Sequence, residues 1–352
     1  MALPLIHGGP DGGPEIRFDF STNANALGPL PAVLDAINAA SRRHYPDPAY
    51  TALRQLLGDW HGVDAARVLP AGSAGEFIWR ITQWQALAQR SQGRALRVWT
   101  ATQAYGEYAA AARAVAAQVL HWPLASRLPP DLQAGDLCWL TEPHSPSGTS
   151  LLPDLPVWLD AAERAGATLV LDLAYQPLRL DARHDSPLLD AASCSAWQLW
   201  SPNKACSLTG VRGAYAIAPV GAVEPAAALR AHAPSWVLGI EGQAMLEAFC
   251  GAAAQQELSA HRNKLAVLRD QMEAALTQRG WQWSAGVTPF ALVRAPVAVE
   301  QAPLWLADLR SAGVKLRDAT SFGLPGWARI NAQPAPAQAA LYEAWDTWGA
   351  KQ

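Results

Sequence analysis

The chain has 352 residues and a formal net charge of −3, and 50% of its residues are hydrophobic while 16% are charged. This composition supports a sizeable core and excludes wholesale disorder, and at about 150 residues per domain the length corresponds to two or three domains, or to one large domain with a smaller companion. The near-neutral charge argues against a protein whose main task is to bind nucleic acid or an anionic membrane.

The four cysteines are scattered and form no C-x-x-C pair, so the sequence predicts neither a disulfide framework nor a metal site. The first residues have no basic start followed by a long apolar run, unlike a secretory signal. No uninterrupted apolar stretch reaches the roughly 18 residues that a membrane span needs. We therefore expect a cytoplasmic protein with reduced thiols that contacts neither membranes nor nucleic acid.

The first 60 residues predict an irregular arm followed by two helices. Residues 1–30 are rich in Gly, Pro and Asn, which are typical of irregular structure. Apolar positions recur at helical spacing over 31–43, and Pro31 suits a first helical turn. After a Pro-rich break at 45–48, a second amphipathic helix is expected around 53–60.

From about residue 68 the chain alternates between apolar runs and helical segments. A short apolar run at 68–71 leads into a small-residue turn. Further strands are expected at 95–100, 136–141, 167–173, 197–200 and 213–217, and helices at 76–89, 108–117 and 155–165. Such alternation predicts an α/β fold with a mostly parallel sheet that helices cover on both faces.

The pattern changes near residue 235, where a long helical stretch over 240–279 begins and shorter strands and helices follow. We expect an N-terminal arm over 1–35 that contributes to the small domain and the active site. A large ligand-binding domain would cover 36–235, and a smaller α+β domain 236–352. The sixteen tryptophans are expected to fill the core and a subunit interface.

The segment from Ser201 to Tyr215 contains the sharpest local signal. Lys204 follows a buried strand and precedes Arg212, which glycines flank, by eight residues. A lysine near other cations or in a dry pocket loses its proton easily and can form a Schiff base with an aldehyde. The arginine offers a fork for phosphate, and the glycines let the backbone approach closely. Taken alone, the segment is slightly better explained by a surface lysine and a structural arginine.

Two further features stand at the ends of predicted strands. Asp172 ends an apolar strand, at the edge where open α/β sheets bind ligands, and could keep a pyridine nitrogen protonated. Tyr175 could donate a hydrogen bond to a ring phenolate, although Asp172 could equally cap the next segment. The turn 72–75 precedes a helix and could hold phosphate, but it lacks the Gly-Lys-Ser/Thr of a Walker loop, and such turns are common.

A phosphate-binding turn, an aspartate, a lysine and an arginine eight residues later are, in this order, what a pyridoxal phosphate enzyme requires. On these residues, and over nearly its whole length, the chain resembles the fold-type I, class I/II aminotransferase superfamily. Within it, the chain is similar to the histidinol-phosphate aminotransferases and to the threonine-phosphate decarboxylases of cobalamin biosynthesis. The stretch 19–29 is shared by both, and only His7-Gly8-Gly9 favours the decarboxylases. The stretch 45–47 matches both.

The resemblance implies a fold-type I fold, pyridoxal 5′-phosphate as cofactor, and a homodimer with shared active sites. It implies that Lys204 bonds covalently to the cofactor, that Asp172 and Tyr175 contact the pyridine nitrogen and ring oxygen, and that Tyr105 stacks on the ring. The remaining implied cofactor contacts are Ser73, Ala74, Ser145, Ser201 and Arg212, with Tyr45 from the neighbouring subunit. The implied substrate contacts are Arg329, Arg317, His7 and Asn25. Two arginines suit a substrate with both carboxylate and phosphate.

The chain departs from the family at one loop. Where these families usually read Asn-Pro-Asn-Asn-Pro-Thr-Gly, residues 142–148 read Glu-Pro-His-Ser-Pro-Ser-Gly. Ser145 therefore replaces an asparagine that usually bonds the cofactor's ring oxygen, and His144 adds a group that can titrate near neutral pH. Asn203 stands where a serine or threonine is common. These departures bear on the substrate and the reaction rather than on cofactor binding.

The leading hypothesis is therefore decarboxylation of threonine phosphate, and the alternative is transamination of histidinol phosphate or a related amino acid or amino alcohol phosphate. Which reaction occurs depends on the bond at the α-carbon that is held perpendicular to the cofactor ring. Two other classes stay open: a cofactor-binding protein without catalysis, and a nicotinamide-dependent dehydrogenase. The intact lysine and arginines disfavour the first, and the lack of a G-x-G-x-x-G after the first strand disfavours the second.

Overall fold

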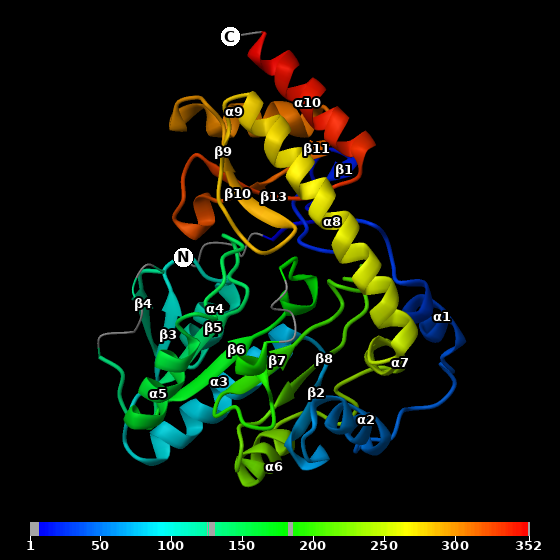
Figure 1. The fold of residues 1–352 in the computed structure, drawn as a ribbon. Coiled ribbons are helices and arrows are strands. Elements are labelled where there is room, and N and C mark those ends of the chain that lie inside the picture. Colours follow the sequence, from blue (N-terminus) through cyan, green and yellow to red (C-terminus); the bar gives the residue numbers. More distant parts are fainter. Residues whose placement is uncertain (1–6, 125, 127–130, 182–185, 351–352) are drawn as a thin grey trace.

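The computed structural model describes residues 7–124, 126, 131–181 and 186–350. A large sheet with flanking helices forms one part, which we call the large domain, and a smaller antiparallel sheet with its own helices forms the small domain (Figure 1). A long helix, α8 (Ala252–Gln278), runs from the side of the large domain to the small domain.

The large sheet has seven strands in the order β2-β8-β7-β6-β5-β3-β4. Their bounds are β2 Val68–Ala71, β3 Arg97–Ala101, β4 Gln118–Trp122, β5 Leu137–Thr141, β6 Thr168–Asp172, β7 Trp197–Trp200 and β8 Ala214–Ile217. Only β8 runs against its neighbours, and every other pairing is parallel. The prediction of a mostly parallel sheet is confirmed.

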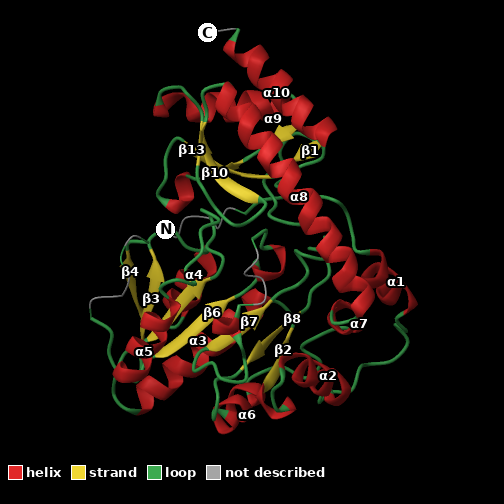
Figure 2. Cartoon of the chain, viewed as in Figure 1, coloured by secondary structure: helices red, strands yellow, loops and turns green. Residues whose placement is uncertain are grey.

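Both faces of this sheet are apolar, because alternate residues of each central strand enter different cores. Val98 and Trp139 pack with Phe77 of α3 (Ala74–Ser91), while Leu140 and Leu171 pack with α5 (Leu155–Ala165). Helices α4 (Gly106–Ala114) and α6 (Val223–Ala231) join the α3 side (Figure 2). Burial on both faces is the arrangement that parallel sheets require.

A third group of helices covers the β2 edge of the large sheet. These are α1 (Pro31–Ala39), α2 (Thr51–His61) and α7 (Ile240–Phe249), which share a core with α8. The helical stretch expected over 240–279 is broken at Cys250 and Gly251, which separate α7 from α8. Periodicity alone does not show this break, because both helices remain apolar on one face.

The small domain contains the sheet β12-β13-β10-β9 and a two-stranded pair, β1 with β11. The strands are β1 Phe18–Asp19, β9 Gln282–Trp283, β10 Phe290–Arg294, β11 Val314–Lys315, β12 Arg317–Asp318 and β13 Trp327–Asn331. Helices α9 (Ala302–Ser311) and α10 (Ala335–Gly349) pack against the sheet together with α8. Because β1 pairs with β11, the N-terminal arm belongs to this domain's core.

Four tryptophans form the centre of the small domain. The Trp281 ring lies edge-on to those of Trp305 and Trp345, with centroids 5.3 and 4.7 Å away, and Trp348 stacks on Trp345. Edge-on and offset pairs of this kind add about 0.5–1.5 kcal/mol each beyond the area they bury. These tryptophans therefore serve packing, as expected.

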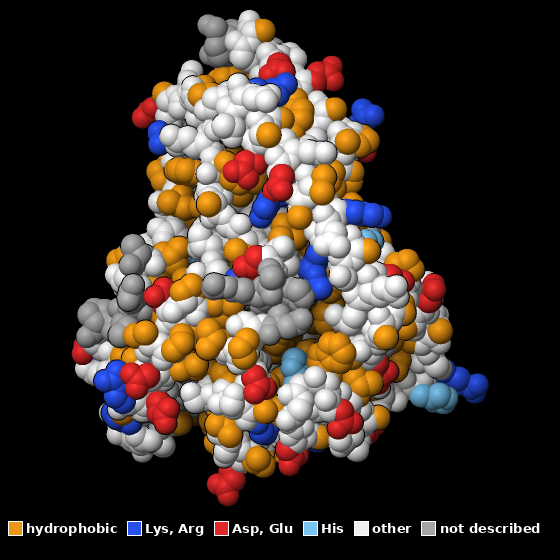
Figure 3. Space-filling model, viewed as in Figure 1, with side chains coloured by type: hydrophobic (Ala, Val, Ile, Leu, Met, Phe, Trp, Pro, Cys, Tyr) orange, Lys and Arg blue, Asp and Glu red, His pale blue; other side chains and the backbone are white. Residues whose placement is uncertain are grey.

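The surface shows no large single-sign region on the face drawn in Figure 3, where positive and negative side chains are interspersed. Within the described residues, no helix combines the length and apolar character needed to cross a membrane.

Candidate active site

The predicted cofactor residues meet at one edge of the large sheet. The parallel strands all end at this edge, so the segments that follow them converge there. Asp172 is the last residue of β6, Lys204 follows the end of β7, and Ser73 lies just beyond β2. Arg212 reaches the same edge because β8, which it precedes, runs the other way.

Asp172 is a buried carboxylate, 4% exposed, that two neutral donors hold in place. The Tyr108 hydroxyl donates to Oδ2 at 2.6 Å, and the Ala174 backbone N–H donates to Oδ1 at 3.1 Å. Tyr108 is itself fixed by stacking on Trp139, with ring centroids 4.6 Å apart. Within the described residues Asp172 forms no ion pair, so a cation brought by a ligand would be a favourable partner.

Tyr108 is a site residue that the sequence did not reveal. It lies inside α4 among alanines and reads there as an ordinary apolar contact. Only the three-dimensional structure shows that its hydroxyl lies between Asp172 and the Thr141 hydroxyl, 3.0 Å from the latter. The one available signal was its spacing of three residues from Tyr105, which places both rings on one side of a helix start.

Lys204 and Tyr175 are in direct contact, with the Lys204 Nζ 4.4 Å from the centre of the Tyr175 ring. Burial raises the pKa of Tyr175, but Lys204, Arg329 and Asn23 together outweigh it, and the net shift is downward. A tyrosine hydroxyl whose pKa is lowered is a stronger hydrogen-bond donor to a neighbouring anion. The pairing of Tyr175 with a ring oxygen stays a prediction.

Tyr105 lies beside Tyr108, edge-on, with ring centroids 5.7 Å apart. Burial, and then the nearby acidic groups, raise its pKa, while Arg212 opposes that shift. His7 of the N-terminal arm is 6.0 Å from the Tyr105 ring, centre to centre, so the arm reaches this edge of the large domain. The Arg212 side chain is exposed and therefore accessible to an anionic ligand.

The turn before α3 has the form of a helix N-terminus with a serine cap. The Ser73 hydroxyl accepts from the Glu76 N–H at 3.0 Å, and Glu76 in turn accepts from the Gly72 N–H at 3.2 Å. The first N–H groups of a helix have no intrahelical acceptor, so those of Ala74 and Gly75 can face an anion. Gly72 has no room for a side chain, since a Cβ there would lie 2.6 Å from the Val237 carbonyl oxygen.

The loop that departs from the family pattern is held by a buried ion pair. Arg179, fully buried, bonds Glu142, and both also bond the Ser150 hydroxyl, at 2.8 and 2.9 Å. Glu142 therefore acts as a structural anchor for the loop. The loop also contains two cis peptide bonds, each preceding a proline, at 142–143 and 145–146.

Ser145 faces the small domain. Its hydroxyl accepts from Arg329 Nη1 at 3.2 Å, and Arg329 Nη2 donates to the Ser21 carbonyl at 3.0 Å. This arginine thereby joins the arm, the small domain and the loop 142–150. Arg329 is 8% exposed, its Nε has no hydrogen-bond partner, and it forms no ion pair with any residue the structure describes. A buried guanidinium in this state would be stabilised by an anionic ligand.

Arg317 lies directly across from Arg329 in the β12–β13 pair, so both side chains project from the same face of the small sheet. Burial and the neighbouring charge of Arg329 lower the pKa of Arg317 to about 10. Arg317 also bonds the Ser321 hydroxyl at 2.6 Å. The two predicted substrate arginines are thus adjacent, and an anion between them would relieve their mutual repulsion.

Three further predicted site residues, Asn25, Ser201 and Tyr45, contact different parts of the chain. The Asn25 side chain bonds the Ala205 carbonyl at 3.0 Å and lies 2.8 Å from His261 Nδ1, which ties the arm to the lysine loop. Ser201 donates to Asn203 Oδ1 at 3.0 Å. Tyr45 is 77% exposed and stacks on Trp236, outside the site of its own chain. Its role and those of the other site residues stay predictions.

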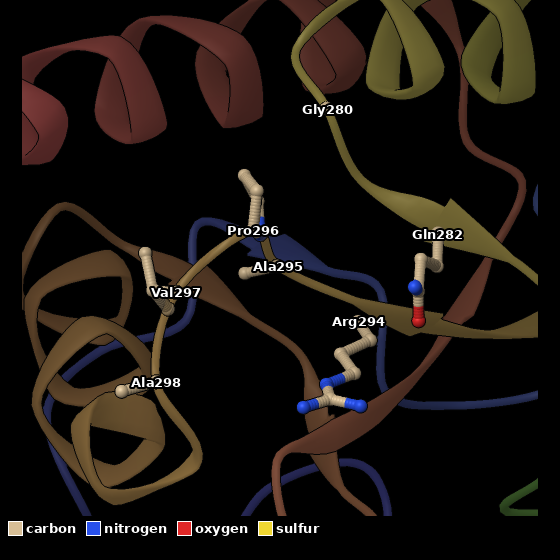
Figure 4. Close-up of a pocket in the computed structure, with 7 residues that line it drawn as sticks. All are labelled: Gly280, Gln282, Arg294, Ala295, Pro296, Val297 and Ala298. Atoms are coloured by element: carbon tan, nitrogen blue, oxygen red, sulfur yellow. The ribbon is translucent and has the colours of Figure 1, made fainter.

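A separate cavity of about 430 Å³ lies on the small domain (Figure 4). Its lining includes Gly280, Gln282 and the segment 294–298, with Arg294 and Gln282 side by side as register partners of β10 and β9. None of the predicted site residues is among the described residues that line it. The chemistry suggested by the sequence is therefore located at the large-sheet edge.

Comparison with known proteins agrees with this geometry. A sequence profile described as aminotransferase class I and II matches residues 15–346. The chain belongs to this family. The class I and II aminotransferases depend on pyridoxal 5′-phosphate, and the fold-type I fold expected from the sequence is confirmed. The chain is thus an enzyme of a pyridoxal-phosphate-dependent family.

Among curated relatives, a histidinol-phosphate aminotransferase from Granulibacter bethesdensis is 28% identical, over 90% of this chain and 85% of that protein. An aromatic amino acid aminotransferase from Streptomyces coelicolor is 30% identical, over 76% of this chain and 74% of that protein.

Two solved structures share the fold at low identity. Histidinol-phosphate aminotransferase from Sinorhizobium meliloti, in complex with pyridoxal-5′-phosphate, has a TM-score of 0.76 at 20% identity, covering 95% of this chain and 92% of that one. L-threonine-O-3-phosphate decarboxylase from Porphyromonas gingivalis also has a TM-score of 0.76, at 21% identity, covering 94% and 99%.

The residues present in this class I and II family member suit the cofactor of the family. Asp172 is a buried anion without a cationic partner in the described part of the chain, as a protonated pyridine nitrogen requires. The backbone N–H groups at the start of α3 and the Arg212 side chain offer donors for a phosphate. Lys204 and Arg329 are both close enough to Tyr175 to lower its pKa, so the predicted cofactor and substrate residues adjoin one another.

Proposed function

We propose that this protein is an aminotransferase that takes the amino group from a phosphorylated amino compound of the histidinol-phosphate type. The observation that supports it most is the buried pair Arg317 and Arg329, two adjacent cations that face the same site as Lys204. The names of the curated relatives favour transamination over decarboxylation, which was the leading hypothesis from the sequence.

The roles of the residues follow from their positions. The bound cofactor supplies a conjugated ring that draws electrons from the substrate's α-carbon. Asp172, fixed by Tyr108, would hold the ring nitrogen in its protonated form, and Tyr175 would donate a hydrogen bond to the ring oxygen. Arg329 and Arg317 would bind the substrate's phosphate. Lys204 Nζ would carry a proton to and from the substrate's α-carbon as general base and acid.

Decarboxylation of threonine phosphate is the second candidate, and one observation favours it. His7, which belongs to the His-Gly-Gly start that resembles the decarboxylases, lies 6.0 Å from Tyr105 and thus beside the site. The two reactions differ in the bond that is aligned with the cofactor's π system, and hence in where the arginines hold the anionic groups.

One experiment separates the two reactions. The protein loaded with pyridoxal phosphate is given histidinol phosphate together with a series of 2-oxo acids, and the new amino acid is measured. In parallel, carboxyl-labelled threonine phosphate is supplied without any acceptor, and released carbon dioxide is counted. Acceptor-dependent amino transfer without carbon dioxide supports the proposal. Release of carbon dioxide without an acceptor contradicts it and favours the decarboxylase.

We further propose that the enzyme acts in the cytoplasm as a homodimer in which Tyr45 reaches the partner's site. The exposed stack of Tyr45 on Trp236, with centroids 4.4 Å apart, supports this, because large exposed aromatic rings are enriched at interfaces. Sedimentation should show a dimer at all practical dilutions. A protein that is active and stays monomeric at high protein concentration would contradict the shared site.

A further inference from the structure

The N-terminal arm changes partners just before it reaches the predicted catalytic lysine. Residues 18–19 form β1, which pairs with β11 of the small domain, and the Ala24 carbonyl accepts from the Asn331 side chain at 2.8 Å. The backbone N–H of Asn25, the next residue, donates instead to the Lys204 carbonyl at 2.9 Å. The arm therefore passes from the small domain to the lysine-bearing loop of the large domain within one peptide unit.

Asn25 and the residues after it hold the loop that carries Lys204. Asn25 Nδ2 donates to the Ala205 carbonyl at 3.0 Å. The Leu30 N–H donates to the Cys206 carbonyl at 3.3 Å. Together with the bond to the Lys204 carbonyl, three consecutive carbonyls of this loop accept from the arm. Because these bonds restrict rotation of the loop backbone, they also restrict where the Lys204 side chain begins.

Two backbone groups set the orientation of the Asn25 amide. The Leu27 N–H donates to Oδ1 at 3.1 Å, and the Ala205 carbonyl accepts from Nδ2. A flipped amide would place oxygen against the carbonyl and the amide nitrogen against the N–H, so only this orientation satisfies both groups. The atom that lies 2.8 Å from His261 Nδ1 is therefore Nδ2, a donor. His261 Nδ1 must accept, and hence carries no proton.

His261 belongs to α8, the helix that runs from the side of the large domain to the small domain (Figure 1). Burial, and then the nearby Lys264, lower the pKa of His261, although Glu257 opposes the shift. The neutral, accepting form is therefore favoured at physiological pH. Asn25 is only 1% exposed, so an amide hydrogen left there without an acceptor would be costly. Helix α8 supplies that acceptor.

Both amide hydrogens of Asn25 are used within the protein. An amide nitrogen has two hydrogens, and the Ala205 carbonyl and His261 Nδ1 accept them. This leaves the side chain no donor for a ligand, in contrast to the substrate contact that the resemblance implies. The geometry instead suits a residue that acts on the reaction through the backbone of Lys204.

We propose that Asn25 and His261 are positioning residues for Lys204. His261 holds the Asn25 amide, and the amide holds the loop backbone so that Lys204 Nζ stays beside the Tyr175 ring. A proton carrier must be aligned with the atom it serves, and a misplacement of about 1 Å can cost about 100-fold in rate. This inference deepens the proposed function, since it rests on the role given there to Lys204.

Two replacements of His261 test the acceptor atom. In His261→Asn the side-chain oxygen can take the place of Nδ1, whereas His261→Leu keeps the bulk and removes the acceptor. The visible absorbance of the lysine-bound cofactor is titrated with pH, without any substrate. Its midpoint should move by about half a pH unit or more in His261→Leu, because the lysine nitrogen changes surroundings, and stay close to that of the unaltered protein in His261→Asn.

The kinetics should show the same dependence. In His261→Leu, kcat for amino transfer from histidinol phosphate should fall about tenfold while KM changes little, since the substrate arginines are untouched. His261→Asn should restore most of this loss. Asn25→Ala, which removes both bonds of the amide nitrogen, should lower kcat by about 100-fold and move the absorbance midpoint at least as far as His261→Leu does.

Gln338→Leu is the matched control for a buried amide bonded to α8. Gln338 Nε2 donates to the Leu268 carbonyl of α8 at 2.9 Å and to the Gln333 carbonyl at 2.8 Å, in the small domain. Like Asn25, this amide nitrogen makes two hydrogen bonds and is buried. Gln338→Leu should lower the thermal stability of the protein and leave both the absorbance midpoint and kcat unchanged.

An absorbance midpoint that is the same in His261→Leu, Asn25→Ala and the unaltered protein overturns the proposal. Equal shifts in His261→Leu and His261→Asn also overturn it, as does a comparable shift in Gln338→Leu. A midpoint that depends on the His261 acceptor, in a protein that transfers no amino group from histidinol phosphate, would contradict the proposed function and support the positioning role. Amino transfer with a kcat and a midpoint that neither His261 replacement alters would do the reverse.

Discussion

The two halves of the candidate site are built in different ways. The cofactor half consists of segments that follow neighbouring strands of one sheet, so the pairing of β6 with β7 brings Asp172 and Lys204 close together. The substrate half forms where three distant segments meet: Arg329 bonds Ser21 of the arm and Ser145 of the loop 142–150. Cofactor binding should therefore tolerate changes that disrupt substrate binding.

The halves also contain buried side chains of opposite charge. The cofactor half has a buried carboxylate at Asp172, and the substrate half has two buried guanidinium groups, Arg317 and Arg329. Within the described residues, Asp172 and Arg329 form no ion pair, whereas Arg317 bonds the Ser321 hydroxyl within the small domain. A cofactor with a cationic ring nitrogen and a substrate with an anionic end would complete both. Uncompensated buried charge of this kind is more typical of a binding site than of a structural core.

The largest effect is expected from Lys204→Ala, which breaks the cofactor half at its reactive group. Amino transfer should fall by roughly 10⁴-fold or more, since proton transfer alone contributes about 10²–10⁴-fold and covalent attachment is lost as well. The visible absorbance of the lysine-bound cofactor should vanish, while thermal stability changes little. Retention of that absorbance in the variant would contradict the assignment of Lys204.

Arg329→Gln should impair substrate binding while leaving cofactor binding intact. Loss of a buried cation that binds an anion costs about 2–5 kcal/mol, so kcat/KM for an anionic amine should fall by roughly 100-fold or more. The absorbance of the bound cofactor should persist, because Arg329 contacts Ser21 and Ser145 rather than Asp172. Parallel loss of cofactor and activity would instead show that the halves are one cooperative unit.

The difference between the halves also explains what the sequence could predict. The strand end at Asp172 and the loop with Lys204 after β7 were predictable, because an apolar run and the residues that follow it are local features. Tyr108 was not, since its hydroxyl reaches Asp172 across 64 positions of sequence. Nor was the bond from Arg329 to Ser145, which spans 184 positions and joins the two domains.

Local sequence patterns also failed to predict some elements of the fold. Strand β4 was not predicted, because this edge strand is half exposed and lacks the continuous apolar run of its buried neighbours. Helix α6 was also missed, since its apolar residues are mostly alanines with little periodic contrast.

Two buried histidines of the large domain, His144 in the loop 142–150 and His61 in the core, should make stability depend on pH. Burial lowers the pKa values of His61 and His144 from 6.5 to about 4, so between these limits the unfolded chain binds protons that the folded chain does not. The free energy of unfolding should therefore fall as the pH drops from 6.5 to 4, by about 1.4 kcal/mol per pH unit for each histidine. Urea unfolding at several pH values measures the slope.

Replacing either histidine by asparagine should remove the contribution of that histidine to the slope. The carboxylates contribute equally to the unaltered protein and to each variant, so the difference between the slopes isolates the histidine. A substrate-like carboxylate should reduce the contribution of His144, because a nearby anion favours the protonated imidazole, and should leave that of His61, which bonds Tyr215 in the large-domain core, unchanged. Identical slopes in the unaltered protein and both variants would show that neither imidazole is held neutral by the fold.

The smallest effect is expected at Tyr108, and it concerns the rigidity of the cofactor half. Tyr108→Phe keeps the ring stacked on Trp139 and removes only the hydrogen bond to Asp172. The free energy of unfolding should fall by about 1.5 kcal/mol, the usual value for a hydrogen bond to a charged group, and cofactor affinity should weaken with it. Tyr342→Phe is the matched control, because that hydroxyl bonds Gln338 at a partly exposed position and should matter less. Equal, small losses in both variants would mean that Tyr108 only packs, and that Asp172 is oriented by its own backbone contact.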